Sequence, residues 1–96
     1  MTNNLELVLY TRPTCSDCQD AKTYLASHAI SYHGKDVAKD LSLEQEMIEI
    51  SGNRIVPLFA FYKKGILGKK KLVESFIGFE ANKKVILKLL NSIDKA

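Results

Sequence analysis

The sequence lacks the features that mark membrane-spanning, secreted or disulfide-rich proteins. Its 96 residues contain no tryptophan, two prolines, two cysteines and no apolar run close to the roughly 20 residues that span a membrane. The opening residues, Met1 to Glu6, have neither a basic region nor a long apolar stretch, so no signal peptide is expected and the expected location is cytoplasmic. Thiols stay reduced in that compartment, so a lone pair of cysteines is expected to be catalytic or metal-binding rather than a structural staple.

The net charge of the chain is also small. The net charge of +3 is too small to indicate nucleic-acid binding by itself, and neither a nucleic acid nor a membrane is an expected partner. Five lysines nevertheless fall within nine residues, namely Lys63, Lys64, Lys69, Lys70 and Lys71. This cluster fits either a solvated hairpin tip or a docking patch for an acidic partner protein.

What remains is the composition of an ordinary globular chain. With 46% apolar and 26% charged residues, no repeat and no internal linker, residues 1–96 are expected to form a single domain. Hydrophobic spacing predicts the order β-α-β-α-β-β-α, an α/β fold whose first two strands are parallel and whose last two form an antiparallel hairpin. The strands are expected at residues 5–10, 30–37, 58–62 and 71–77, and the helices at about 16–28, 42–50 and 83–93.

The two cysteines form a Cys15-x-x-Cys18 motif between the first strand and the first helix, where such a motif indicates redox chemistry. Ser16 or Asp17 is expected to cap the helix, so Cys15 lies at or just before its first turn. There the helix N-terminus and Arg12 favour a Cys15 thiolate, whereas Asp17 opposes both. Cys15 is therefore the expected nucleophile, and the more buried Cys18 is expected to resolve the mixed disulfide.

The second helix has its own boundary signals. Ser42 followed by Gln45 matches a capping box. Gly52 or Asn53 is expected to end this helix, because either residue adopts the left-handed conformation that closes a helix.

A second element of the candidate site is Val56-Pro57, just before the third strand. An X-Pro bond is the main place where a cis peptide occurs, and a cis bond here would leave the backbone of Val56 facing the cysteine loop. An extended substrate segment would then pair with that backbone by strand addition. An ordinary trans proline entering a strand is the alternative.

Together these features resemble the glutaredoxin branch of the thioredoxin fold. The resemblance covers roughly residues 5–90 and implies a central four-stranded mixed sheet flanked by three helices, a cis Pro57, and a dithiol–disulfide oxidoreductase in which Cys15 attacks and Cys18 resolves. It is carried by Tyr10 to Cys18, Ala21-Lys22, Leu25, Ile55-Val56-Pro57 and Gly78-Phe79.

The resemblance also implies where a substrate binds and what the protein works with. The expected partners are a disulfide-containing protein, with ribonucleotide reductase as one candidate, and an external reductant, which is either glutathione or thioredoxin reductase with NADPH. No bound cofactor is expected, and the chain is expected to be a monomer. The expected substrate-binding residues are Arg12, Thr14, Val56, Pro57, Gly78 and Phe79.

Two departures favour thioredoxin reductase over glutathione. Glutaredoxins that bind glutathione tend to carry Gly-Gly and then an Asp, where this chain has Gly78-Phe79 and Asn82. An Asn cannot make a charge-assisted pair with the glutathione amino group. Gly-Phe is similar to small redoxins that thioredoxin reductase reduces and that supply electrons to ribonucleotide reductase. A glutathione-dependent glutaredoxin is the alternative.

Zinc binding is the first alternative use of the same cysteines. Cys15, Cys18, His28 and His33 form a Cys-x2-Cys-x9-His-x4-His pattern, but a zinc finger needs about 12 residues in the middle gap. His28 is also expected near a helix end and His33 on a separate strand, so no metal is predicted. An iron–sulfur cluster held by Cys15 and glutathione, and a binding module without activity, are further alternatives.

Overall fold

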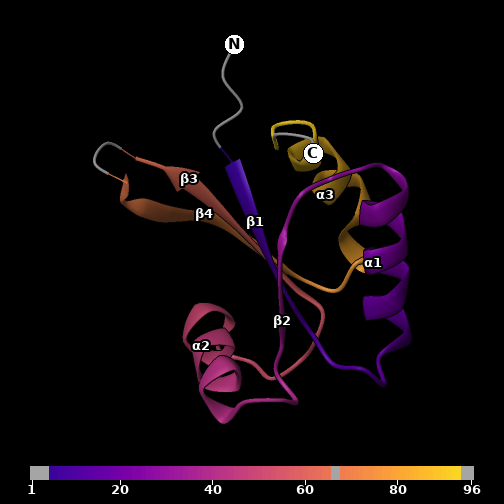
Figure 1. The fold of residues 1–96 in the computed structure, drawn as a ribbon, viewed down its shortest axis with the longest axis vertical. Coiled ribbons are helices and arrows are strands. Elements are labelled where there is room, and N and C mark those ends of the chain that lie inside the picture. Colours follow the sequence, from indigo (N-terminus) through magenta and orange to yellow (C-terminus); the bar gives the residue numbers. More distant parts are fainter. Residues whose placement is uncertain (1–4, 66–67, 94–96) are drawn as a thin grey trace.

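A four-stranded mixed sheet forms the centre of the fold in the computed structural model, which describes residues 5–65 and 68–93 (Figure 1). The strand order is β2-β1-β3-β4, with helices α1 and α3 over one face and α2 over the other (Figure 1). The elements are β1 (Leu5–Thr11), α1 (Ser16–Ser27), β2 (His33–Asp36), α2 (Leu41–Ser51), β3 (Leu58–Lys64), β4 (Lys70–Ile77), a 3₁₀ turn η2 (Glu80–Asn82) and α3 (Lys83–Leu90).

The predicted element order and sheet type are confirmed. β1 pairs in parallel with β2 and antiparallel with β3, and β3 pairs antiparallel with β4. The second strand is shorter than predicted, because it begins at His33 and not at Ile30. The N–H of Ile30 donates to the carbonyl of Leu25 at 3.0 Å, and Ala29 has a φ of 52°, so these residues close α1, and the continuous strand starts only at His33.

Both faces of β1 are buried, which explains its nearly continuous apolar sequence. Leu7 and Leu9 point into a core shared with α1 and α3. Tyr10 points the other way, into a smaller core that includes Met47 of α2. A central strand with helices on both faces has no polar side to present to water, so alternation is lost along it.

Helix caps differ from the sequence expectation at two of three places. Cys15, not Ser16 or Asp17, is the N-cap of α1, because its sulfur accepts the N–H of Cys18 at 3.1 Å. The predicted capping box at Ser42 and Gln45 is wrong, since the N-cap lies two residues earlier, at Asp40, whose side chain accepts the Ser42 N–H at 2.9 Å. An aspartate directly before the helix is an equally good cap. The expected left-handed closure is confirmed at Gly52, whose φ is 72°.

The β3–β4 hairpin extends away from the helices and carries the lysine cluster (Figure 1). Lys63 lies directly opposite Lys71, and Lys64 lies opposite Lys70. Glu6 on β1 bridges the second pair, at 3.2 Å from Lys64 and 2.6 Å from Lys70. These ion pairs, with the hydrogen bond to Lys70 as the largest contribution, lower the pKa of Glu6.

Two segments that the sequence analysis used lie outside the described residues. They are residues 1–4, on which the signal-peptide expectation rests, and residues 66–67, which fall within the sequence range of the lysine cluster. Among the described helices, none has the length and apolar character needed to cross a bilayer.

Candidate functional site

Cys15 and Cys18 lie where β1 ends and α1 begins. Thr11 is the last residue of β1 and is buried. The Cys15 N–H donates to the Arg12 carbonyl at 3.3 Å, and the Cys15 carbonyl accepts from the N–H of Gln19 at 3.1 Å. The backbone on both sides of Cys15 is therefore held, and the sulfur is the part of the residue that is free to react.

The two thiols have different environments. Both are free, but Cys15 is partly exposed whereas Cys18 is fully buried, as predicted. Burial raises the pKa of the Cys18 thiol to about 12, and the hydrogen bond with Cys15 adds to the increase. Cys18 is therefore a protonated thiol at neutral pH, and only Cys15 is accessible to a substrate from outside.

The Val56-Pro57 peptide lies beside Cys15 and is cis, as the family resemblance implied. The Cys15 sulfur is 3.8 Å from the carbonyl oxygen of Val56. Val56 is partly exposed, while Pro57 is buried and its carbonyl accepts the N–H of Gly78 at 2.8 Å. Residues from three distant parts of the chain therefore meet at the cysteine; pairing of a substrate strand with Val56 stays a prediction.

Asp17, inside the motif, has a role that the sequence analysis missed. Its carboxylate accepts hydrogen bonds from the backbone N–H groups of Phe79 at 2.7 Å and Glu80 at 3.3 Å. Gly78 precedes them with a φ of 96°, a conformation that favours glycine. The sequence signal was the position of Asp17 between the two cysteines, where its negative charge opposes a Cys15 thiolate. That position suggests that other groups bind the Asp17 carboxylate, but it does not say which groups they are.

Arg12 is also engaged within the chain. Its guanidinium forms a 2.5 Å ion pair with Glu44 on α2, and the side chains of Arg12 and Glu44 are 31% and 17% exposed. Glu44 carries no sequence signal that would mark it as the partner of Arg12. Thr14, another predicted substrate contact, is exposed in the same loop.

Phe79 and Asn82 hold the loop before α3 in place. The Phe79 side chain is 3% exposed and packs against Phe59 and Tyr24, with ring centroids 5.8 and 5.9 Å apart. The Asn82 amide donates to the carbonyls of Ile77 at 2.7 Å and Gly78 at 3.1 Å. Phe79, a predicted substrate contact, therefore reaches the site through its backbone, while its side chain belongs to the core.

The two histidines lie away from the cysteines. His28 caps the far end of α1 and stacks on Tyr24 with ring centroids 4.0 Å apart, and His33 opens β2. Within residues 5–65 and 68–93, no three His, Cys, Asp or Glu side chains come together in a way that would hold a metal ion.

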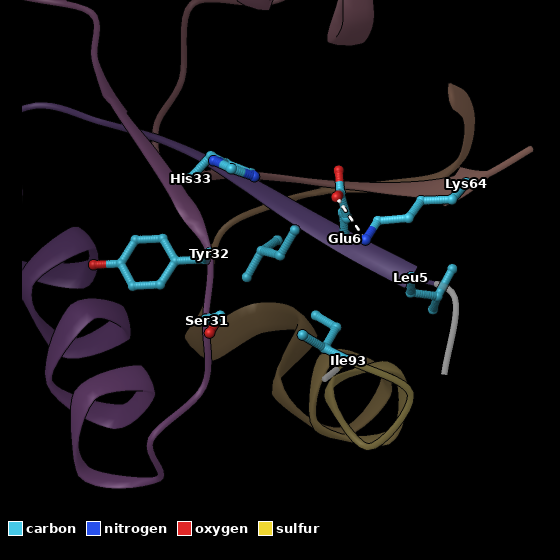
Figure 2. A pocket seen from close by; sticks show the side chains of 8 residues that line it. Leu5, Glu6, Ser31, Tyr32, His33, Lys64 and Ile93 are labelled. Atoms are coloured by element: carbon cyan, nitrogen blue, oxygen red, sulfur yellow. Dashed lines mark ion pairs between the residues drawn. The ribbon is translucent and has the colours of Figure 1, made fainter. Parts of the chain in front are cut away.

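A separate hollow of about 180 Å³ lies at the other end of β1 (Figure 2). Its walls include Leu5, Tyr32 and Ile93, and the Glu6–Lys64 ion pair lies at its side (Figure 2). No cysteine lines it, so the Cys15–Cys18 pair and this hollow are distinct features.

Comparison with known proteins places this geometry in a family. A glutaredoxin family model matches residues 7–61, more than half of the chain. Trichomonas vaginalis thioredoxin has a TM-score of 0.67 and 22% identity, covering 92% of this chain and 78% of that one. The buckwheat glutaredoxin–glutathione complex has a TM-score of 0.62 and 16% identity, and the match covers 93% of this chain and 76% of the buckwheat chain. Archaeoglobus fulgidus glutaredoxin has a TM-score of 0.59 and 20% identity, and the match covers 84% of this chain and 85% of the other. No curated protein gives a significant sequence match.

At these identities the solved structures show the fold, which is that of thioredoxins and glutaredoxins. Two neighbouring cysteines on this fold suggest a redox oxidoreductase. The family match runs from within β1 to within β3, and so includes both cysteines and Val56-Pro57. On that evidence the chain belongs to the glutaredoxin family.

Proposed function

We propose that the protein is a dithiol–disulfide oxidoreductase that reduces disulfides in other proteins. The observation that carries this proposal is the contrast within one motif, where an accessible Cys15 caps a helix and a buried Cys18 lies one turn behind it. A reaction that uses two thiols in sequence needs this asymmetry. The substrate disulfide must react with the accessible thiol first, and the buried thiol must react only with the mixed disulfide that results.

The reaction begins when the Cys15 thiolate attacks one sulfur of a substrate disulfide. That bond breaks, the leaving sulfur takes the electron pair and a proton, and Cys15 is joined to the substrate in a mixed disulfide. Cys18 then gives up its proton and attacks the Cys15 sulfur. The second substrate thiol leaves, the substrate has gained two electrons, and Cys15 and Cys18 are joined as a disulfide.

The raised pKa of Cys18 supports this order. Burial is the largest cause of the increase, and the sulfur of Cys15 adds to it through a hydrogen bond and, when it is a thiolate, through its charge. Once Cys15 is bonded to the substrate it no longer carries a negative charge. The proton of Cys18 is then easier to remove, at the step where the Cys18 thiolate is needed.

A polypeptide disulfide is the proposed substrate. The carbonyl of Val56 lies 3.8 Å from the Cys15 sulfur and belongs to a partly exposed segment just before β3. A substrate in extended conformation can form backbone hydrogen bonds with such a segment, which would place its disulfide next to Cys15.

The proposed reductant is thioredoxin reductase with NADPH. Asn82 is uncharged and its amide is used within the loop, in the place where glutathione-binding glutaredoxins tend to carry an Asp. The related buckwheat protein was solved with glutathione, so glutathione is the competing candidate. Ribonucleotide reductase is a candidate among the protein substrates.

Reduction of insulin by dithiothreitol, followed as turbidity, tests the activity. The wild-type protein should accelerate it, Cys15→Ser should return it to background, and Gln19→Ala, an exposed position on the same helix, should keep it. Full activity of Cys15→Ser would overturn the assignment. NADPH consumption with thioredoxin reductase should exceed that with glutathione and glutathione reductase; the opposite order would reverse the choice of reductant.

A further inference from the structure

We propose that Asp17 and Glu44 are specificity-determining residues that keep anionic peptide thiols, glutathione above all, from binding at Cys15. This inference rests on the proposed function and explains its preference among reductants. Each of these carboxylates occupies, from within the chain, a group beside the redox pair that would otherwise bind a carboxylate of a ligand.

The first of these groups is the Arg12 guanidinium. A guanidinium is the side chain best suited to hold a carboxylate, and the carbonyl of Arg12 is bonded to the Cys15 N–H, so the two residues share one turn. The guanidinium is already paired with Glu44 at 2.5 Å, and both side chains are partly buried. A ligand carboxylate would have to displace Glu44 and leave that carboxylate without its cation.

The second group is the pair of backbone N–H groups of Phe79 and Glu80. Both donate to Asp17, at 2.7 and 3.3 Å, and Asp17 lies between the two cysteines. The loop that carries them is fixed through Gly78, whose N–H is bonded to the Pro57 carbonyl. The donors therefore face the redox motif, where a tethered carboxylate satisfies them at a high effective concentration.

Glutathione has two carboxylates, so it loses both anchors at this site. To reduce the Cys15–Cys18 disulfide, one glutathione thiolate attacks the Cys15 sulfur, and Cys18 leaves with the electron pair and takes a proton. A second glutathione thiolate then attacks the glutathione sulfur, which releases glutathione disulfide and the Cys15 thiolate. Both steps are slow when glutathione is held weakly. A protein disulfide that binds along the Val56 backbone needs neither anchor.

The test measures the reduction of the oxidised protein by glutathione, with rapid alkylation and mass spectrometry as the readout. Asp17→Ala and Glu44→Ala are compared with Asp20→Ala and Glu49→Ala, exposed positions on the same two helices that remove the same charge without freeing a donor. Dithiothreitol, an uncharged dithiol, reports any change in the disulfide itself. If Asp17→Ala does not fold, Glu44→Ala alone carries the test, because Asp17→Asn would keep an acceptor oxygen on the Phe79 and Glu80 N–H groups.

We expect each variant to raise the glutathione rate, relative to the dithiothreitol rate, by about threefold to tenfold over its matched control, and the gain to be smaller with glutathione diethyl ester. An equal gain in the controls, with dithiothreitol, or with the ester would overturn the inference. Insulin reduction by the wild-type protein tests the proposed function separately. A wild-type protein that reduces insulin, with variants that gain nothing toward glutathione, would refute this inference alone.

Discussion

The Asp17 carboxylate accepts a 2.7 Å hydrogen bond from the backbone N–H of Phe79, which lies 62 residues further along the chain. This bond joins the redox motif at the start of α1 to the loop that leads into α3. The geometry around Cys15 therefore depends on a loop that carries no cysteine, and changes at either end of this bond should be felt at the other.

Loss of this connection should reduce stability. Asp17→Ala leaves two backbone N–H groups without their acceptor, and we expect it to lower the free energy of unfolding by about 1–3 kcal/mol. The exposed Asp20 on the same helix is the matched control, and Asp20→Ala should change it by less than about 0.5 kcal/mol. Urea unfolding of the reduced proteins measures both; similar midpoints for the two variants would argue against a stabilising role of Asp17.

The two cysteines should differ in their reactivity toward iodoacetamide. At neutral pH in the folded protein, Cys15 should be alkylated at least about tenfold faster than Cys18, because Cys18 is fully buried and its pKa is raised to about 12. Peptide mass spectrometry after timed quenching measures the two rates. In urea the difference should disappear, and equal rates in the folded protein would contradict the division of roles.

Replacement of Cys18 should stop the reaction halfway. In Cys18→Ser the Cys15 thiolate can still attack a substrate disulfide, but no thiol is present to release the mixed disulfide. We expect a covalent complex with the substrate that survives non-reducing electrophoresis and is dissolved by dithiothreitol. The Cys15→Ser variant is the control and should form none.

Buried Cys18 should also make stability depend on pH. Below a pH of about 9, the ordinary thiol pKa, the group is protonated in both the folded and unfolded states. Above it the unfolded chain releases this proton while the folded chain keeps it up to about pH 12, so stability falls as the pH rises. Between pH 9 and 10 the reduced wild-type protein should lose roughly 1 kcal/mol more than Cys18→Ala. Parallel urea-unfolding curves for the two proteins would show that Cys18 does not contribute.

The role of Phe79 can be separated into side chain and backbone. Because its ring is buried against Phe59 and Tyr24, Phe79→Ala should cost about 3–5 kcal/mol, and Phe79→Leu much less. Phe79→Leu should keep insulin reduction, since the backbone N–H that meets Asp17 is unchanged. Normal stability with lost activity in Phe79→Leu would mean that the ring does contact the substrate, as the family resemblance suggested.

The parts of the fold that were predictable are those encoded by neighbouring residues. Strand and helix order follows from hydrophobic spacing, and the closure at Gly52 follows from the conformational freedom of glycine. The cap of α1 was missed because cysteine is not a preferred capping residue, although the Cys15 sulfur accepts a helix N–H. The family resemblance supplied the cis Pro57, which the residue pattern alone left open.

The connections around the site were not predictable in the same way. Arg12 pairs with Glu44, 32 residues away, and Asp17 meets the backbone of Phe79, 62 residues away. Backbone N–H groups carry no sequence signature, and each acidic residue in the chain was an equal candidate partner for Arg12. Only the folded arrangement selects among them.

The lysines of the hairpin have a consequence for how the chain meets copies of itself. β4 is an edge strand, and Lys63 faces Lys71 across the ladder. Cross-strand lysines repel each other, which weakens the hairpin slightly. A second β4 approaching along the same edge would bring the positive charges of both strands together. The same repulsion therefore disfavours edge-to-edge pairing of two β4 strands, which is a common first step of aggregation.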